Sequence, residues 1–564
     1  MNPTNPAIVA QAAARRLPRG ALLLFCLAYM LPGFIGRDAW KSADASALGF
    51  MAELAHGSSA WLHPTLIGMP SENPTLLAYW LGAWALQWAP AWIAPDFAAR
   101  IPFLFLLALA MAGTWYGTYY LARSPRAQPV VFAFGGEASP KDYARAIGDA
   151  GLLALIASLG LAQLSHETTP ALAQTAFTAL VFYALSALPY RPVIATVAMA
   201  FGLIGLSLSG APTLSAVFGI GGLLIHLMDR KDADQKAPVT ALTSWTIALA
   251  IALAIGLAHQ LDLLRWKVEW PVEKLAYWSG LGQLLLWFTW PAGPLALWTL
   301  WRWRKQILSR HISRHLAVPI WMLAATLAAT LTSNASDRTL MLALPALAAL
   351  AAFALPTLQR QVAALIDWFT LLFFSSCAMV VWVVWLAMQT GYPSQPAANV
   401  ARLAPGFEAE FSTLGFGLAL VATGVWAWLV KWRVGRHRAA IWKSLVLPAG
   451  GAALCWLLLM TLWLPLLNYA QSYNAMVKRA AAQINPAGCV ESLGLSEGKI
   501  AALQFYGNLE MRFAKDIPAC PWLIAEPGDN MSAPDSLDEK QWILLAPIRH
   551  PTDGNESVLI FRRR

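Results

Sequence analysis

The sequence predicts a mainly α-helical, polytopic membrane protein with a small C-terminal α/β domain. Hydrophobic residues make up 58% of the 564 residues and charged residues only 12%, whereas a soluble domain carries about 25% charged residues. The apolar residues come in blocks such as Ile101–Ala122, Thr240–Leu261 and Phe369–Thr390, which reach the roughly 20 residues that cross a bilayer. Beyond residue 465 the composition changes abruptly to mixed polar sequence.

The apolar blocks divide the first 465 residues into about 13 predicted spans. They lie near residues 20–36, 98–122, 149–165, 170–188, 193–210, 212–228, 240–261, 281–301, 316–333, 339–357, 366–389, 412–430 and 445–465. The first block follows Arg15, Arg16 and Arg19 but has no small-x-small cleavage site after it. We therefore expect it to remain as a span rather than to be removed as a signal peptide.

Lys and Arg residues predict the orientation of these spans. They concentrate in loops on the N-terminal side, around residues 123–145, 302–314 and 431–443, whereas loops 334–338 and 391–411 contain few. The positive-inside rule then places the N-terminus in the cytoplasm and the C-terminus in the periplasm of a bacterial inner membrane. The net charge of +10 is explained by these loops, so no nucleic-acid partner is expected.

The polar tail, residues 466–564, reads as a small α/β domain. Asn474–Ile484 is predicted to be a helix, and Ile500–Phe505, Gln541–Pro547 and Ser557–Phe561 are predicted strands. The tail holds two cysteines, Cys489 and Cys520, which should form a disulfide in an oxidising periplasm. The alternative is a pair of free thiols.

Residues 37–97, after the first span, form the longest predicted outer loop of the membrane region, and loops of this length are usually functional. The spacing of Ala47, Phe50, Met51 and Leu54 predicts an amphipathic helix on the membrane surface, and Leu76–Trp88 predicts a second. The segment concentrates acidic residues: Asp38, Asp44, Glu53, Glu72 and Asp96. We therefore expect the chemistry of the protein here.

The same segment contains an ordered set of motif residues. Asp44 opens the predicted surface helix, a turn ends at Trp61, and Glu72-Asn73-Pro74 precedes Tyr79-Trp80. This order resembles the first periplasmic loop of the PMT-like glycosyltransferases, in which an acidic residue opens a surface helix and an E-K-P motif precedes Tyr-Trp. That group includes bacterial lipid A aminoarabinose transferases and relatives of protein O-mannosyltransferases. Ala98–Pro102 resembles the family's A-x-R-L-P at the start of the second span.

The resemblance implies a GT-C fold and an enzyme, a hexosyl- or pentosyltransferase that takes its sugar from a polyprenyl-phosphate donor. The catalytic domain is then residues 1–465, and residues 466–564 form a periplasmic domain. The acceptor is lipid A, another glycan or a protein, and membrane lipids are the other partners. No nucleotide is expected because the leaving group is polyprenyl phosphate, and the sequence contains no Walker loop.

Asp44 is the candidate catalytic residue, because a carboxylate beside the acceptor can take its proton as the sugar–phosphate bond breaks. Lys41, three residues earlier, is expected to keep Asp44 ionised or to contact phosphate. The alternative for Asp44 is a solvated acid on a helix face.

Four further residues are expected to bind substrate. Arg338 resembles the cation of a family S-x-x-K/R segment, which would grip the lipid phosphate, and its alternative is an ion pair with Asp337. Arg100 is placed by its motif, although a structural role is equally consistent with the sequence. His166 and Glu167 form a polar pair at an outer boundary, near the family's T-D-x-P position.

Glu72 and His259 are the candidate ligands for a divalent metal, and Glu72 and Asn73 also count as substrate-binding. The alternatives are a turn cap for Glu72 and an interfacial side chain for His259. Asn73 stands where the family has Lys, and Ala47 stands where aminoarabinose transferases have Arg. These departures argue against simple assignment to the aminoarabinose transferases.

Three other functions compete with glycosyl transfer. A flippase or transporter of lipid-linked glycans should show two matching halves with broken helices, which the sequence lacks. An O-antigen ligase or polymerase should carry its large loop later in the chain. A non-catalytic assembly protein would use the tail to bind partners.

Overall fold

The computed structural model describes residues 5–71, 74–232, 237–264, 275–332, 336–435, 440–484, 488–514, 519–528, 534, 537 and 540–564. The membrane region contains α1 (Arg19–Met30), α4 (Pro95–Ala122), α5 (Pro140–Ala157), α6 (Leu161–Leu164), α7 (Pro170–Ala187), α8 (Pro192–Leu208), α9 (Pro212–Asp232), α10 (Ala237–Gln260), α11 (Leu275–Thr289), α12 (Ala292–Arg302), α13 (Arg304–Ile307), α14 (Arg314–Thr332), α15 (Asp337–Met341), α16 (Leu344–Ala354), α17 (Arg360–Thr390), α18 (Ser394–Leu403), α19 (Thr413–Gly435) and α20 (Lys443–Leu462).

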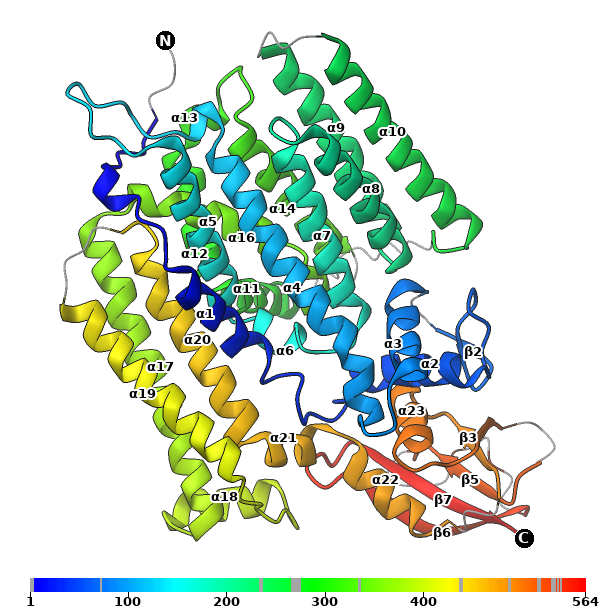
Figure 1. Ribbon diagram of the computed structural model, residues 1–564. Coiled ribbons are helices and arrows are strands. Elements are labelled where there is room, and N and C mark those ends of the chain that lie inside the picture. Colours follow the sequence, from blue (N-terminus) through cyan, green and yellow to red (C-terminus); the bar gives the residue numbers. More distant parts are fainter. Residues whose placement is uncertain are drawn as a thin grey trace.

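Within the described residues, eight helices are long and apolar enough to cross a membrane, namely α4, α7, α9, α10, α14, α17, α19 and α20. Most side chains of α17 and α19 are at least partly exposed, whereas α7 and α20 are largely buried. Exposed apolar surface of this extent requires lipid around it. The molecule is thus a polytopic membrane protein, with α7 and α20 inside the bundle (Figure 1).

The remaining predicted spans coincide with helices that are shorter, more polar or interrupted. Segment 281–301 is divided into α11 and α12 around Pro291, and segment 339–357 into α15 and α16. Proline lacks the backbone N–H that would continue the first helix. The eleven-residue α16 is entirely buried and rich in Ala, so it forms the centre of the bundle.

Close packing of α4 against α7 relies on small residues. A Cβ at Gly113 of α4 would lie 2.8 Å from the carbonyl oxygen of Ala179 in α7. Such contacts replace the hydrophobic effect in holding membrane helices together. They fix the position of α4, whose first turns carry Arg100 to the candidate site.

Two helices and a small hairpin of the 37–97 segment cover one end of the bundle: α2 (Ala43–His56), β1 (Thr65–Leu66), β2 (Met69–Pro70) and α3 (Leu77–Trp88). Both predicted surface helices are present. The expectation that α2 rests its apolar face on lipid is wrong, however, because Ala47, Phe50, Met51 and Leu54 are buried by protein. Helix α2 lies between α3 and the C-terminal domain (Figure 1).

The C-terminal domain follows α21 (Leu464–Gln471) and combines α22 (Asn474–Ala481) and α23 (Glu497–Phe505) with a mixed sheet. The sheet has the order β4-β3-β5-β7-β6, formed by β3 (Val490–Leu493), β4 (Met511–Phe513), β5 (Trp522–Ala525), β6 (Trp542–Arg549) and β7 (Ser557–Arg563). β3 pairs in parallel with β4 and β5, and β7 pairs antiparallel with β5 and β6. The α/β character predicted for the tail is confirmed.

One predicted strand of this domain is wrong. Residues 500–505 belong to helix α23, which begins after Ser496 and buries Ile500, Ala501, Ala502 and Leu503. The run contains Ala, Leu and Gln, which are good helix formers. A short apolar run does not distinguish a helix from a strand by itself. Here the packing of the run against α2 favours the helix.

Candidate functional site

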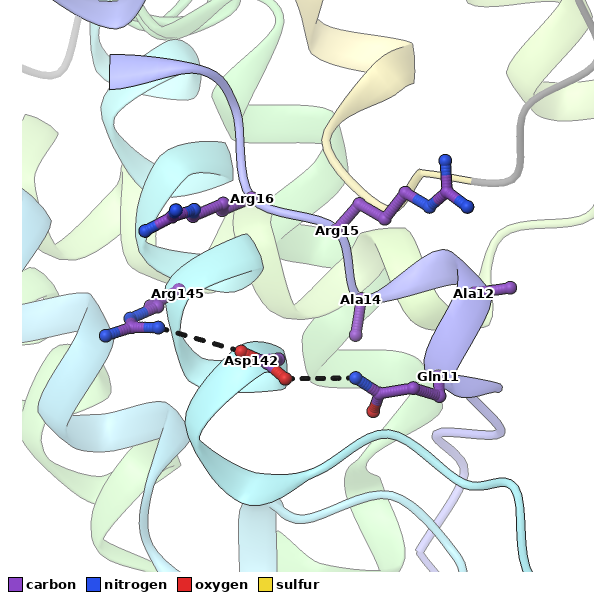
Figure 2. Close-up of a pocket in the computed structure, with 7 residues that line it drawn as sticks. All are labelled: Gln11, Ala12, Ala14, Arg15, Arg16, Asp142 and Arg145. Carbon is purple, nitrogen blue, oxygen red and sulfur yellow. Dashed lines mark hydrogen bonds and ion pairs between the residues drawn. The ribbon is translucent and has the colours of Figure 1, made fainter.

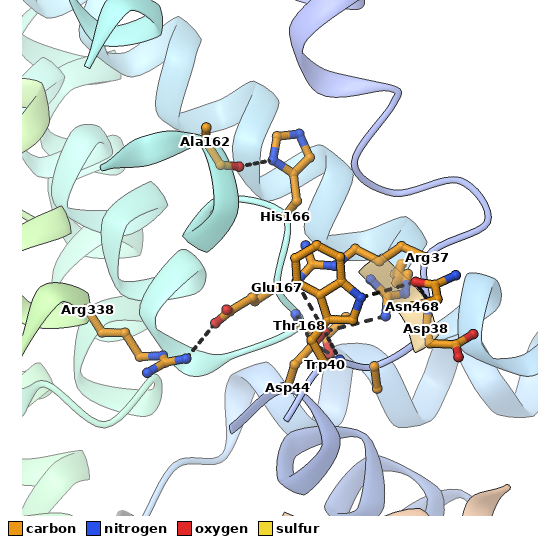
Figure 3. Close-up of polar contacts among 12 residues, drawn as sticks. Arg37, Asp38, Trp40, Asp44, Ala162, His166, Glu167, Thr168, Arg338 and Asn468 are labelled. Carbon is orange, nitrogen blue, oxygen red and sulfur yellow. Dashed lines mark hydrogen bonds and ion pairs between the residues drawn. The ribbon is translucent and has the colours of Figure 1, made fainter. Parts of the chain in front are cut away.

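Asp44 lies in the first turn of α2 and is the centre of a buried polar cluster. Its Oδ1 accepts hydrogen bonds from the backbone N–H of Thr168 at 2.7 Å and from the Thr168 hydroxyl at 2.6 Å. Its Oδ2 accepts a bond from the backbone N–H of Trp40 at 3.3 Å. The carboxylate therefore ties the start of the outer segment to the loop before α7 (Figure 3).

Two arginines face the same carboxylate. Arg100 Nη2 lies 3.4 Å from Asp44 Oδ2, and Arg37 Nη2 lies 3.7 Å from it. Both arginines are only 1% exposed, and the Arg37 guanidinium also lies 3.9 Å from the ring centroid of Trp40. Apart from Nη2 of Arg100, the side-chain nitrogens of these two residues make no hydrogen bond in the described part of the chain. Buried cationic donors of this kind suit an anionic ligand.

The electrostatic surroundings keep Asp44 ionised. Burial alone would raise the pKa of Asp44, but Arg100, Arg37 and the Thr168 hydrogen bonds outweigh it and bring the pKa below its ordinary value. Its place at the N-terminus of a helix favours the same charge state. Burial lowers the pKa of Arg37 to about 10, so this guanidinium still carries its charge at neutral pH.

Glu167 and Arg338 form the other half of the cluster. Arg338 Nη2 donates to Glu167 Oε2 at 2.8 Å, and the glutamate side chain is only 3% exposed. Burial raises the pKa of Glu167 above its ordinary value, and the attraction of Arg338 offsets only part of that effect. The guanidinium of Arg338 is farther from the expected alternative partner, since its Nη1 lies 4.0 Å from Oδ1 of Asp337. Glu167 is therefore the principal counter-charge of this guanidinium.

His166 stands next to Glu167 but points away from it, toward α1 (Figure 3). Its Nδ1 lies 2.6 Å from the carbonyl oxygen of Ala162, and its Nε2 lies 3.1 Å from that of Tyr29. The ring is fully buried and packs against Phe34 and Trp456. This position anchors the 166–169 loop to α1, and it replaces the substrate contact that we expected for His166.

Lys41 does not form the expected pair with Asp44. Its Nζ lies 2.7 Å from Oδ2 of Asp553 in the C-terminal domain. Helix α2 begins only at Ala43, so Lys41 precedes the first turn and the i to i+3 helical spacing does not apply. Arg37 and Arg100 take the place beside Asp44 that we assigned to Lys41.

The C-terminal domain holds the same outer segment at several further points. The backbone N–H of Ala39 donates to the Tyr506 hydroxyl at 2.8 Å. The hydroxyl of Ser46 donates to Glu497 at 2.7 Å. Hydrogen bonds from both sides of Asp44 thus reach this domain, which supports the position of the cluster.

Of the two expected metal ligands, Glu72 and His259, only His259 lies within the described residues. Glu72 and Asn73 lie outside the described residues. His259 is exposed at the C-terminal end of α10, and the described residues contain no group of three or more His, Cys, Asp or Glu side chains arranged to hold a metal ion. Metal binding stays a prediction.

The two cysteines of the tail form a disulfide, Cys489–Cys520, with a Cα–Cα separation of 5.1 Å, within the usual range for this bond. Cys489 immediately precedes β3 and Cys520 precedes β5. The bond therefore joins the starts of two neighbouring parallel strands.

Sequence reasoning missed Arg37, the residue of the cluster with the most buried nitrogens that lack a hydrogen bond. A signal was present, because Arg37 follows the first apolar block directly and ionisable residues at a membrane boundary are often functional. Thr168 was missed as well, since a hydroxyl in a Thr-Thr-Pro run ordinarily indicates the start of a helix.

Comparison with known proteins identifies solved structures that have a similar fold. No family model and no curated protein sequence matches the chain. Among solved structures it is similar to ArnT from Cupriavidus metallidurans bound to undecaprenyl phosphate, with a TM-score of 0.58 and 12% sequence identity over 97% of this chain and 98% of that chain. The apo structure of the same protein gives a TM-score of 0.57 and 14% identity over 96% and 98%. Over nearly its whole length, the chain has the GT-C fold of ArnT.

Proposed function

We propose that this protein is a glycosyltransferase that moves a sugar from a polyprenyl-phosphate donor to a lipid, glycan or protein acceptor on the periplasmic face of the membrane. The observation that carries the proposal is the set of buried guanidinium nitrogens of Arg37 and Arg100 beside Asp44. The similarity to ArnT, which was solved with undecaprenyl phosphate bound, supports a donor of the same class.

The charges of the cluster fit the departure of a lipid phosphate. Arg37, Arg100 and Arg338 outnumber the two carboxylates, Asp44 and Glu167, which leaves an excess of positive charge for an anionic group. Preorganised cations that face developing negative charge stabilise a transition state without reorganisation. In the proposed reaction the bond between the sugar carbon and the phosphate oxygen breaks, and the phosphate leaves with the electron pair.

The acceptor oxygen attacks the same sugar carbon from the opposite side, which inverts its configuration. If the acceptor is a hydroxyl, its proton must go to a base. Glu167 suits this role better than Asp44, because a raised pKa brings a carboxylate closer to working pH. We therefore assign Asp44 to holding the arginines and the Thr168 loop, and Glu167 to receiving the proton.

A flippase of lipid-linked glycans is less well supported. Transporter sites lie near the middle of the bilayer, whereas the Asp44 cluster lies at one end of the bundle, beside the first turns of α4 and α7 (Figure 1).

The test is complementation of a deletion strain, followed by mass spectrometry of its lipid and glycan fractions. The wild-type gene should restore one missing sugar mass, and Asp44→Asn should not, although the variant is inserted and elutes as a folded protein in detergent. Asp96→Asn, in the same outer segment but outside the cluster, is the matched control and should restore the mass. Restoration by Asp44→Asn at the wild-type level would refute the assignment.

A further inference from the structure

A second polar site lies at the end of the molecule opposite the Asp44 cluster. Helix α4 runs from Pro95, near Asp44, to Ala122, and 28 residues of helix span about 42 Å. The loop after Ala122 leads to α5, where this second site begins (Figure 1). It is therefore separated from the proposed transfer site by the thickness of the membrane region.

The N-terminal residues 5–18 form a strap across this end. The backbone N–H of Ala138 donates to the carbonyl oxygen of Val9 at 3.0 Å. The indole N–H of Trp442 donates to the carbonyl oxygen of Arg15 at 2.6 Å. The strap is thus bonded both to the loop before α5 and to the segment before α20, so the side chains that it carries have a defined position.

A pocket of about 530 Å³ opens between the strap and α5. It is lined by Gln11, Ala12, Ala14, Arg15, Arg16, Asp142 and Arg145 (Figure 2). The lining thus contains three arginines and one carboxylate. A cleft lined by one sign of charge attracts ligands of the opposite charge.

Asp142 already has hydrogen-bond and ion-pair partners, and its single charge does not neutralise the arginines of the pocket. Its Oδ2 accepts hydrogen bonds from Gln11 Nε2 at 2.9 Å and from the Ser139 hydroxyl at 2.8 Å. Its Oδ1 lies 3.7 Å from Arg145 Nη1. Asp142 thus holds the strap and one arginine in place, and Arg16 and Arg145 together exceed it by one positive charge.

Arg16 and Arg145 extend from the strap and from α5 toward the same side, whereas Arg15 points the other way (Figure 2). Arg16 makes no hydrogen bond or ion pair with the residues that the structure describes. Two guanidinium groups on the same side can share one anion, and the planar fork of Arg matches phosphate oxygens.

We propose that Arg16 and Arg145 form a binding site for a phosphate group at this end of the protein. The phosphate comes from one of two sources, the headgroup of an acidic phospholipid or a small soluble phosphate. Basic pockets between membrane helices are known to suit anionic headgroups, and α1 begins at Arg19, only three residues beyond Arg16.

The experiment is native mass spectrometry of the full chain in detergent, titrated with phosphatidylglycerol, with phosphatidylcholine and with inorganic phosphate. Arg16→Gln and Arg145→Gln should each weaken binding of phosphatidylglycerol about fivefold, as expected for one basic residue near an anionic headgroup. Arg16→Lys should retain most of the binding. Arg304→Gln, which removes an exposed arginine of α13 outside the pocket, is the matched control and should bind as the wild type does.

The three ligands distinguish the source of the phosphate. Preference for phosphatidylglycerol over phosphatidylcholine that depends on both arginines assigns the site to a lipid headgroup. Binding of inorganic phosphate alone, with the same dependence on both arginines, assigns it to a soluble compound. A variant that combines Arg16→Gln with Arg145→Gln decides the matter. If it unfolds at the wild-type temperature and binds phosphatidylglycerol and inorganic phosphate as tightly as the wild type does, the proposal is overturned.

Discussion

The pKa values of the two carboxylates in the Asp44 cluster are shifted in opposite directions, although both side chains are buried. Asp44 is surrounded by donors, namely two arginines, Thr168 and the Trp40 backbone, and its pKa falls. Glu167 has one arginine as its main counter-charge, and its pKa rises. Two carboxylates whose surroundings shift their pKa values in opposite directions take different roles in a reaction. The opposite directions support the roles proposed above, with Asp44 as a fixed anion and Glu167 as a proton acceptor.

Glu167→Gln should lower the transfer rate by about 10²–10⁴, the usual contribution of a general base, if the acceptor is a hydroxyl. A base acts only when it is ionised, so the wild-type rate should fall as the pH drops through the raised pKa of Glu167. Asp44 stays ionised over the same interval. The measurement is the pH profile of undecaprenyl phosphate release by the full chain.

The Glu167→Gln variant should lack that acid limb, while Asp337→Asn, which changes the exposed neighbour of Arg338, should keep it. A Glu167→Gln profile with the wild-type rate and the wild-type acid limb would exclude the residue as the base.

Helix α2 packs between the membrane region and the C-terminal domain. It packs on α3 and on α23, and Gly49 lets α23 approach closely, because a Cβ at this position would overlap Ala501. The apolar pattern of α2, which predicted contact with lipid, is satisfied by α23 instead. A helix that carries Asp44 is thus supported on the side away from the bundle by a separate domain.

Gly49→Ala should destabilise the protein by about 1–3 kcal/mol, the usual effect of adding atoms to a closely packed contact. Gly256→Ala in α10 is the matched control, since a Cβ there meets nothing within 4 Å and alanine favours a helix over glycine. Thermal unfolding in detergent measures both. A Gly49→Ala variant that unfolds at or above the wild-type temperature would show that α23 does not press on α2.

At the scale of the whole molecule, one end of the bundle carries the Asp44 cluster and the C-terminal domain, and the other carries the arginine pocket of the strap (Figure 1). Opposite ends of a membrane protein face different compartments. The Lys and Arg pattern predicts that the strap is cytoplasmic and that the domain with its disulfide is periplasmic.

Reporter fusions test this orientation. Alkaline phosphatase, which is active only in the periplasm, should be active when fused after Arg564 and inactive when fused within the loop at 302–314. Reversed activities would place the Asp44 cluster on the cytoplasmic side and contradict transfer in the periplasm.

Loss of the Cys489–Cys520 bond should loosen the C-terminal domain. The cysteines are 31 residues apart, and closing a loop of that length contributes about 3–4 kcal/mol on the chain-entropy model. Cys489→Ser combined with Cys520→Ser should make the tail more sensitive to protease in intact membranes and reduce sugar transfer, because this domain supports Ala39, Lys41 and Ser46. Cys377→Ser, which changes a free cysteine, should do neither.

The membrane class, the order of the helices and the α/β character of the tail follow from local sequence, because apolar blocks and composition are local properties. The sequence also selected Asp44, Arg100, Glu167 and Arg338 as candidate site residues. Their partners, by contrast, depend on the fold. Asp44 meets Thr168 across 124 residues of sequence, whereas Lys41, three residues away, faces the C-terminal domain.

The other differences between the predictions from sequence and the structure have the same physical cause. Arg37 lies in the site because the fold brings it beside Asp44. Residues 500–505 form part of a helix that packs on α2, and this contact joins segments far apart in the chain. Local pattern encodes which residues are apolar or charged, but burial and charge pairing depend on which distant segments meet.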